Sequence, residues 1–155
     1  MKNQLIALLT AFLLLCSSTL YAESNLLVVR SKQAFPEAML ALQAAINKHG
    51  YKVARVQHVD IGLTKAGYKT DKYRIVFFGR SDEVRKLSTK YPDLIPFLPQ
   101  SFSIFAEEDQ TLVVTMNPTF LSLRYKQPEL TAIFERWSKD VQAILADLRK
   151  ISVDE

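Results

Sequence analysis

Apolar and polar positions divide the chain into an apolar leader and a longer stretch of short alternating segments. Residues 5–16 are almost wholly apolar; they follow the positive Lys2 and precede small and polar residues that end at Ala22. A positive flank, a short apolar core and a small residue at the end are typical of a secretory signal peptide. We therefore expect residues 1–22 to be removed and residues 23–155 to form a periplasmic or secreted domain.

Two alternatives for the leader remain open. A membrane anchor needs about 20 predominantly apolar residues, and this run is shorter, so we expect no stable membrane span after cleavage. Lipid attachment at Cys16 is the minority alternative, because Leu13-Leu14-Leu15-Cys16 has the outline of a lipobox. However, Leu15 stands where a small residue is expected.

Short apolar and β-branched segments in the exported part predict five strands. In the second, the alternation is broken, and a β-bulge near Arg55 would restore it. The third is apolar at nearly every position, which predicts a central strand covered on both faces. The last two flank the acidic turn Glu107-Glu108-Asp109 and predict an antiparallel hairpin. The five segments are residues 26–30, 51–61, 73–78, 102–106 and 111–116.

Three segments carry apolar residues at helical spacing. The first begins near Pro36 and ends at Gly50; the second is capped by Ser81 and ends at Tyr91-Pro92; the third covers residues 128–151. The resulting order, β-α-β-β-α-β-β-α, predicts an α+β fold. We expect one domain, a two-layer sandwich with a mixed, mainly antiparallel sheet of about five strands packed with helices.

Composition excludes several classes of chemistry. Cys16 is the only cysteine and leaves with the leader, so the exported domain has no thiol for catalysis, a disulfide or a thiolate metal site. The four glycines form no phosphate-binding loop, and no Gly-x-Ser-x-Gly sequence occurs. Without Lys2 the domain has 19 basic and 16 acidic residues, with no basic stripe. Nucleic acid is therefore not an expected partner.

The order of glycines, prolines and aromatics resembles a known family. The residues concerned include His49-Gly50-Tyr51, Tyr73-x-Ile75-x-Phe77-Phe78-Gly79, Leu98-Pro99 and Asn117-Pro118. From about Leu26 to Tyr125 the chain is similar to the domain-of-unknown-function 302 family. That resemblance implies a small α/β sandwich and a homodimer, and it carries no catalytic residues over to this chain.

Four polar residues form the candidate ligand site. His58 and Asp60 are two apart in a predicted strand, so both side chains would lie on one face. Arg55 and Arg74, on adjacent predicted strands, suit an anion. The alternatives are a solvated strand face for His58 and Asp60, and ordinary charge pairs for the arginines with Asp60, Glu107 or Glu108. With two histidines in the chain, we expect no metal site.

Apolar residues offer two further candidates. Six aromatic residues either line a ligand pocket or belong to the core. Prolines interrupt the apolar stretch Leu94, Ile95, Phe97 and Leu98, which we expect to form a dimer or partner surface because such a loop does not bury itself easily. The six aromatics are Phe77, Phe78, Phe97, Phe102, Phe105 and Trp137.

Taken together, these observations predict an exported, non-enzymatic domain that binds a small ligand or a protein partner in the cell envelope. One alternative is a hydrolase or isomerase in which His58 acts as base and Asp60 orients it, which requires His58 to open into a concavity. Another is a structural accessory subunit of an envelope complex. The sequence does not identify a cofactor.

Overall fold

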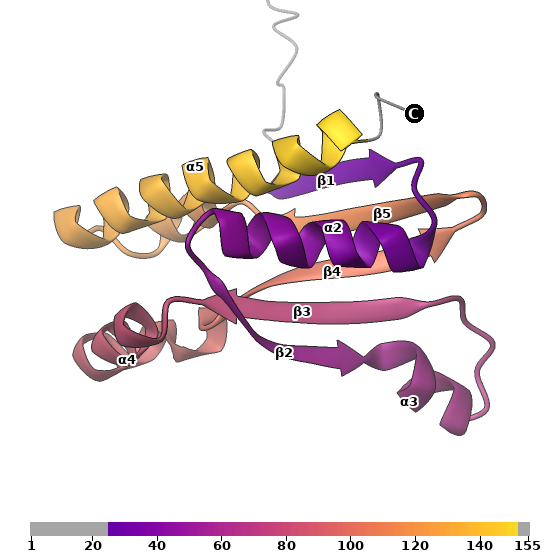
Figure 1. The fold of residues 1–155 in the computed structure, drawn as a ribbon. Helices are drawn as coiled ribbons and strands as arrows, with labels where there is room; N and C mark the ends of the chain where they lie inside the picture. Colours follow the sequence, from indigo (N-terminus) through magenta and orange to yellow (C-terminus); the bar gives the residue numbers. More distant parts are fainter. Residues whose placement is uncertain (1–24, 152–155) are drawn as a thin grey trace, which may run out of the picture.

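The computed structural model describes residues 25–151, so the predicted signal peptide and Cys16 lie outside the described residues. Within residues 25–151, five strands, four α-helices and two 3₁₀-helices follow one another. Figure 1 shows their arrangement. The strands are β1 (Leu26–Ser31), β2 (Lys52–His58), β3 (Tyr73–Gly79), β4 (Gln100–Glu107) and β5 (Gln110–Met116). The helices are α2 (Phe35–Lys48), α3 (Val59–Lys65), α4 (Ser81–Lys90), η1 (Pro92–Phe97), η2 (Pro118–Leu123) and α5 (Pro128–Ile151).

The strands form one antiparallel sheet in the order β1-β5-β4-β3-β2. This confirms the α+β class and the predicted hairpin of β4 and β5. β3 is an interior strand, as predicted, but β4 is central and β3 is not covered on both faces. Val76 and Phe78 are fully buried, whereas Ile75 and Phe77 on the other face are only partly buried.

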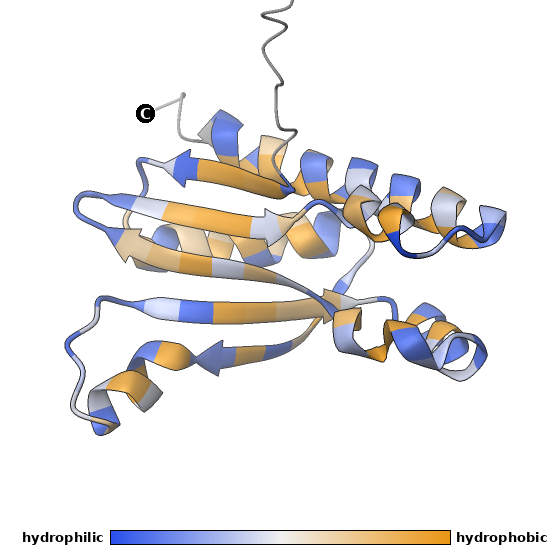
Figure 2. Ribbon diagram, turned by 180° about the vertical axis from the view of Figure 1, so that it is seen from behind, coloured by the Kyte–Doolittle hydropathy of each residue, from blue (hydrophilic) through white to orange (hydrophobic). Residues whose placement is uncertain are grey.

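Both long helices pack on the same face of the sheet, so the molecule has two layers (Figure 1). Leu42 and Ile46 of α2 and Ile144 and Leu148 of α5 are fully buried against alternate strand residues such as Phe102. Burying each such side chain stabilises the fold by roughly 1.5–3 kcal/mol. Seen from behind, no described helix crosses the other face (Figure 2).

The second strand is shorter than predicted. β2 ends at His58, and Val59 begins helix α3, which buries none of its side chains. The ladder explains the difference: His58 pairs with Arg74 near the start of β3, so the residues after His58 have few strand partners left. A register shift between Val53 and Arg55 confirms the predicted bulge.

Two further details differ from the prediction at the end of the sheet where α4 and η1 lie. Arg80 is the N-cap of α4 and Ser81 is its first helical residue, without a side-chain capping bond. Residues 92–97 form η1 instead of an irregular loop, although α4 does end before Tyr91-Pro92. Here α4, η1, η2 and the first half of α5 contribute to a second apolar cluster that includes Trp137 and Phe134. None of the described helices is long and apolar enough to span a membrane.

Candidate functional site

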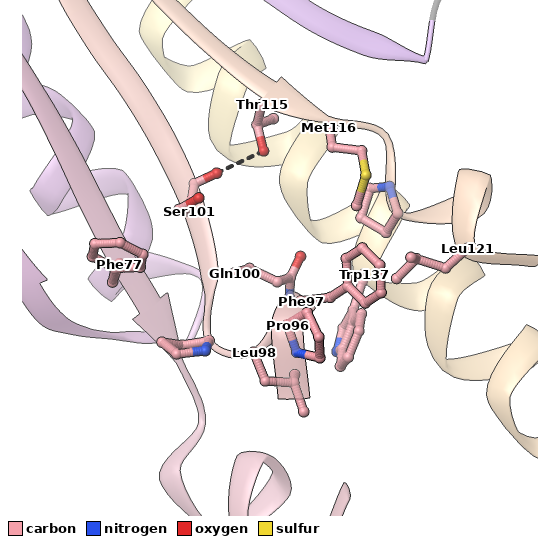
Figure 3. A pocket seen from close by; sticks show the side chains of 12 residues that line it. Phe77, Pro96, Phe97, Leu98, Gln100, Ser101, Thr115, Met116, Leu121 and Trp137 are labelled. Atoms are coloured by element: carbon pink, nitrogen blue, oxygen red, sulfur yellow. Dashed lines mark hydrogen bonds between the residues drawn. The ribbon is translucent and has the colours of Figure 1, made fainter. Parts of the chain in front are cut away.

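β4 and β5 separate at the end of the sheet that lies near η1 and η2. The β4–β5 ladder stops at the pair Ser103 and Val114, whereas β4 stays paired with β3 and β5 with β1 beyond this point. β4 and β5 therefore diverge beyond this pair. Across the gap, the Thr115 hydroxyl donates to the Ser101 carbonyl oxygen at 2.8 Å (Figure 3).

A cavity of about 200 Å³ lies in this division. Its walls come from β3, β4, β5, both 3₁₀-helices and α5, and include Phe77, Phe97 and Trp137. Figure 3 shows Ser101 and Thr115 on the two diverging strands, with Trp137 between them and η2. None of the twelve lining side chains carries a charge. The site is therefore uncharged. Apolar side chains predominate among its lining residues, and the amide of Gln100 and two hydroxyl groups are its polar side chains.

Trp137 is held in place from behind the cavity. Its side chain is 2% exposed, and its indole Nε1 donates to Glu83 Oε2 of α4 at 3.1 Å. Glu83 also pairs with Arg136, and Phe134 packs against the indole with ring centroids 5.7 Å apart. The indole can therefore act as a preorganised wall for a ligand, since it needs little ordering on binding.

A polar network extends this support to the start of β2. The Tyr51 hydroxyl donates to Asp140 Oδ2 at 2.6 Å, and Arg136 lies 3.5 Å from the same carboxylate. Arg80 covers the Tyr51 ring, 4.5 Å from its centroid. Burial, assisted by the bond to Asp140, raises the pKa of Tyr51, so the phenol stays protonated. The network fastens α5 to β2, β3 and α4, and its charges are balanced internally.

The structure brings together only part of the predicted polar site. Asp60 lies in α3 and pairs with Arg74, and each side chain is 15% exposed. The Arg74 hydrogen bond, together with the Ile61 backbone N–H, lowers the pKa of Asp60. Arg74 also lies over the Phe35 ring, 5.7 Å from its centroid. Arg74 therefore forms an ordinary charge pair with Asp60, one of the alternatives that the sequence offered. Because of this pair, the Asp60 carboxylate already has a partner.

The other two residues of that site are placed differently. His58 ends β2 opposite Arg74, but Asp60 has left the strand, so the expected period-two geometry of His58 and Asp60 is wrong. Arg55 pairs with Phe77 on the opposite face of the sheet from His58, because strand side chains alternate. His58 lines none of the five best-defined cavities of residues 25–151. The four residues therefore do not converge.

The four residues of the predicted partner surface differ in exposure. Leu94 is fully buried in the second apolar cluster, whereas Leu98 packs partly against this cluster and also lines the cavity. Ile95 is 53% exposed, and Phe97 is 36% exposed and lines the cavity.

Three of the six predicted pocket aromatics, Phe77, Phe97 and Trp137, do line the cavity. Phe78 and Phe102 stack in the core with centroids 4.8 Å apart, and Phe105 packs on Tyr73 at the other end of the sheet. The sequence reasoning missed Ser101 and Thr115, because nothing in a strand sequence announces that its neighbour will diverge. It also missed Glu83, which looked like an ordinary first-turn acid of α4. In the described part of the chain, no three His, Asp or Glu side chains are grouped so as to hold a metal ion.

Comparison with known proteins agrees with this architecture. The model of the family "Domain of unknown function DUF302" matches residues 27–148. A search of the curated proteins gives no match. The crystal structure of an uncharacterized conserved DUF302 protein from Bacillus stearothermophilus superposes with a TM-score of 0.73 at 19% identity, over 81% of this chain and 98% of that one. At that identity the similarity supports the fold alone, but the family match covers most of the chain. The chain therefore belongs to the DUF302 family.

Proposed function

We propose that this protein is an exported, non-enzymatic binding domain that holds a small neutral molecule with a ring or a compact apolar body. The observation that carries the proposal is the uncharged cavity in the division between β4 and β5, with Trp137 as a fixed wall. Export is supported by the leader that precedes the domain. Small-molecule sites are mostly apolar with a few placed polar groups, which is the character of this lining.

The lining also argues for a neutral ligand. An ionised group placed in this cavity would meet no opposite charge, and burying a charge without a partner is strongly unfavourable. Gln100 and Ser101 can each hydrogen-bond a hydroxyl, carbonyl or amide group of a neutral ligand. The apolar walls then provide most of the affinity through burial.

The cavity has the features of a binding site and lacks those of a reaction site. Its lining contains no histidine, carboxylate, lysine or thiol that could move a proton or attack a bond. The Thr115 hydroxyl donates to a carbonyl oxygen, and the Ser101 side chain has no base beside it in the lining. Binding is therefore the function that these residues support.

The test uses native mass spectrometry of the protein recovered from the compartment to which it is exported. A retained ligand appears as extra mass that is lost on denaturation. Ser101→Leu puts an isobutyl group into the cavity and should remove the extra mass. Ser103→Leu is the matched control, because it lies two residues along the same strand and face but outside the cavity lining. Equal retention by both variants would contradict the proposal.

Trp137 provides a second readout, since it is the only tryptophan in the chain. 4-Nitrobenzyl alcohol, a neutral ring that quenches indole emission on contact, should quench the wild type in a saturable manner. The charged analogue 4-nitrobenzoate should quench much less, and Ser101→Leu should leave only weak collisional quenching. Equal quenching by both probes would exclude a preference for neutral molecules.

A second candidate, a protein partner, is favoured by one observation. The exposed sides of η1 and η2 border the cavity and carry Ile95, Phe97, Phe120 and Leu123, which are 53, 36, 38 and 68% exposed. Exposed apolar patches of this kind mark contact surfaces. In the same mass spectrum such a partner would add the mass of a whole polypeptide, and Leu123→Glu should abolish that addition without removing a small ligand.

A further inference from the structure

A hollow separate from the Trp137 cavity, called the basic hollow below, lies where β3 ends and β2 begins. Figure 1 shows α4 beside this end of the sheet. The volume of the hollow is about 380 Å³, within the range of about 300–1,000 Å³ that is usual for small-molecule sites. Residues of β2, β3 and α4 line it together with Pro99, which is the only lining residue that it shares with the Trp137 cavity. The two spaces therefore have almost entirely different walls.

Two cationic side chains from separate elements line the basic hollow. Lys52 is the first residue of β2, and Arg85 lies in the second turn of α4. No acidic residue lines the hollow. In the described part of the chain, neither cation forms an ion pair, whereas the nearby Arg80 and Lys90 pair with acidic side chains. The hollow therefore has two positive charges that no described acidic residue pairs with.

The rest of the lining provides one hydroxyl group and an apolar wall. Ser81 is exposed, and its hydroxyl can donate or accept a hydrogen bond. Val53, Val84 and Pro99 are apolar. At Gly79 the elements pack closely, because a Cβ atom there would lie 3.0 Å from Val84 Cγ2 and 3.5 Å from Pro99 Cβ. This part of the wall is therefore formed before any ligand arrives, which lowers the cost of binding.

We propose that the basic hollow binds a small organic carboxylate, with the carboxylate on Lys52 and Arg85 and the apolar part against Val53, Val84 and Pro99. The planar guanidinium group of an arginine matches the two oxygens of a carboxylate, and a lysine adds a point charge. A bare anion would use only the two cations, and a neutral molecule would gain nothing from them. The lining therefore favours a ligand with both parts, and this site accepts the anions that the uncharged Trp137 cavity disfavours.

The experiment is an NMR titration of the ¹⁵N-labelled exported chain, residues 23–155, with three probes. Hexanoate should shift the amide signals of Lys52, Ser81 and Arg85 in a saturable manner. 1-Hexanol has the same alkyl chain without the charge, and inorganic phosphate has charge without the alkyl chain. Each of these two should bind at least tenfold more weakly at the same residues. A hollow that binds phosphate or 1-hexanol as tightly as hexanoate, or that binds none of the three, would overturn the proposal.

Variants test the two cations separately. Lys52→Gln and Arg85→Gln should each weaken hexanoate binding about fivefold, and the double variant should weaken it at least 20-fold. Lys86→Gln is the matched control, because it removes one positive charge from α4 but Lys86 does not line the basic hollow. Its affinity for hexanoate should stay within twofold of the wild type. If Lys86→Gln weakened binding as much as Arg85→Gln, net charge and not this hollow would explain the binding. Circular dichroism confirms that each variant is folded.

A further variant separates the basic hollow from the Trp137 cavity. Ser101→Leu fills the cavity, and Ser101 does not line the basic hollow, so hexanoate binding should survive in this variant. Loss of hexanoate binding in Ser101→Leu would place hexanoate in the cavity and overturn the proposal. Conversely, an empty Trp137 cavity in the native mass spectrum would leave the hexanoate titration unaffected. The two proposals can therefore fail independently of each other.

Discussion

The two ends of the sheet differ in how their side chains are satisfied. At the end near α3, Asp60 and Arg74 satisfy each other and leave no cavity between them. At the other end the central strands separate, and an uncharged space remains in front of Trp137. The reactive residue types at the α3 end are therefore paired with each other, and the hollow at that end, lined by Asp71, Lys72 and Phe105 among others, is more open to solvent than the uncharged cavity at Trp137.

This difference teaches that residue chemistry alone is a weak guide to a site. Arginine and aspartate brought close together in a fold tend to pair, because each lowers the free energy of the other in its charged form. A cavity arises instead where regular pairing fails and the surrounding side chains are held from behind. Glu83 and the Tyr51 network do this for Trp137.

The largest effect is expected at the cavity end. Trp137→Ala removes a buried indole from the second apolar cluster and should lower the free energy of unfolding by about 3–5 kcal/mol. Urea denaturation at pH 7, followed by far-UV circular dichroism, measures this. Quenching by 4-nitrobenzyl alcohol cannot be followed in this variant, so ligand retention is measured by mass.

Trp137→Phe separates the two roles of the indole. It keeps an aromatic wall but removes the Nε1–H that donates to Glu83, which should cost about 1–2 kcal/mol, since Glu83 keeps its pair with Arg136. If Trp137→Ala destabilised the protein by less than 1 kcal/mol, the second cluster would not support the cavity end as described.

A smaller effect is expected at the α3 end. Arg74→Met keeps most of the apolar stem over Phe35 but leaves the Asp60 carboxylate, which is 15% exposed, without its partner. We expect a loss of about 1–3 kcal/mol in the free energy of unfolding. Ligand retention should not change, because neither residue lines the cavity.

The double variant Arg74→Met with Asp60→Asn is the control for that prediction. Removing the charge of Asp60 as well should recover part of the loss, because the unpaired carboxylate is the main source of it. A double variant that is as unstable as the sum of the two single variants would show that the two side chains do not interact. Loss of ligand in Arg74→Met would overturn the separation of the two ends.

The contrast between the two ends also explains which features of the fold could be predicted from the sequence. The helix over residues 128–151 and the hairpin of β4 and β5 follow from local periodicity and turn residues, and both are present. The end of β2 at His58 depends on where β3 begins, which is a property of pairing and not of the segment itself. The division at Ser101 and Thr115 is of the same kind, because it depends on the pairing of β4 with β3 and of β5 with β1.

The burial of single side chains at the candidate sites also depends on tertiary structure and not on local sequence. Leu94 and Ile95 are adjacent and chemically similar, yet one is fully buried and the other is 53% exposed. Their difference comes from how η1 packs on α4 and α5, which the apolar composition of the stretch does not reveal. The prediction that this segment forms a contact surface stays a prediction, and tertiary packing decides which of its side chains remain exposed.

The smallest effect concerns pH and the Asp60–Arg74 pair. Because Arg74 lowers the pKa of Asp60 in the folded chain, the stabilisation by this ionised carboxylate is complete above the unfolded-state pKa of about 4 and is lost as the pH falls through the lower folded-state value. Wild type should therefore exceed Asp60→Asn in stability at pH 6, and the gap should narrow below pH 4. Urea midpoints of both proteins at pH 6, 4 and 2.5 measure it.

The comparison between these two proteins isolates Asp60. The pKa values of Glu129 and Asp147 are lowered by Lys90 and Lys48 respectively, and their titration affects wild type and variant alike. Asp71→Asn, a change in the exposed loop before β3, is the matched control and should follow wild type at every pH. A gap that stayed constant from pH 6 to pH 2.5 would mean that Asp60 stabilises the α3 end without its charge, and that this end, like the cavity end, depends on packing.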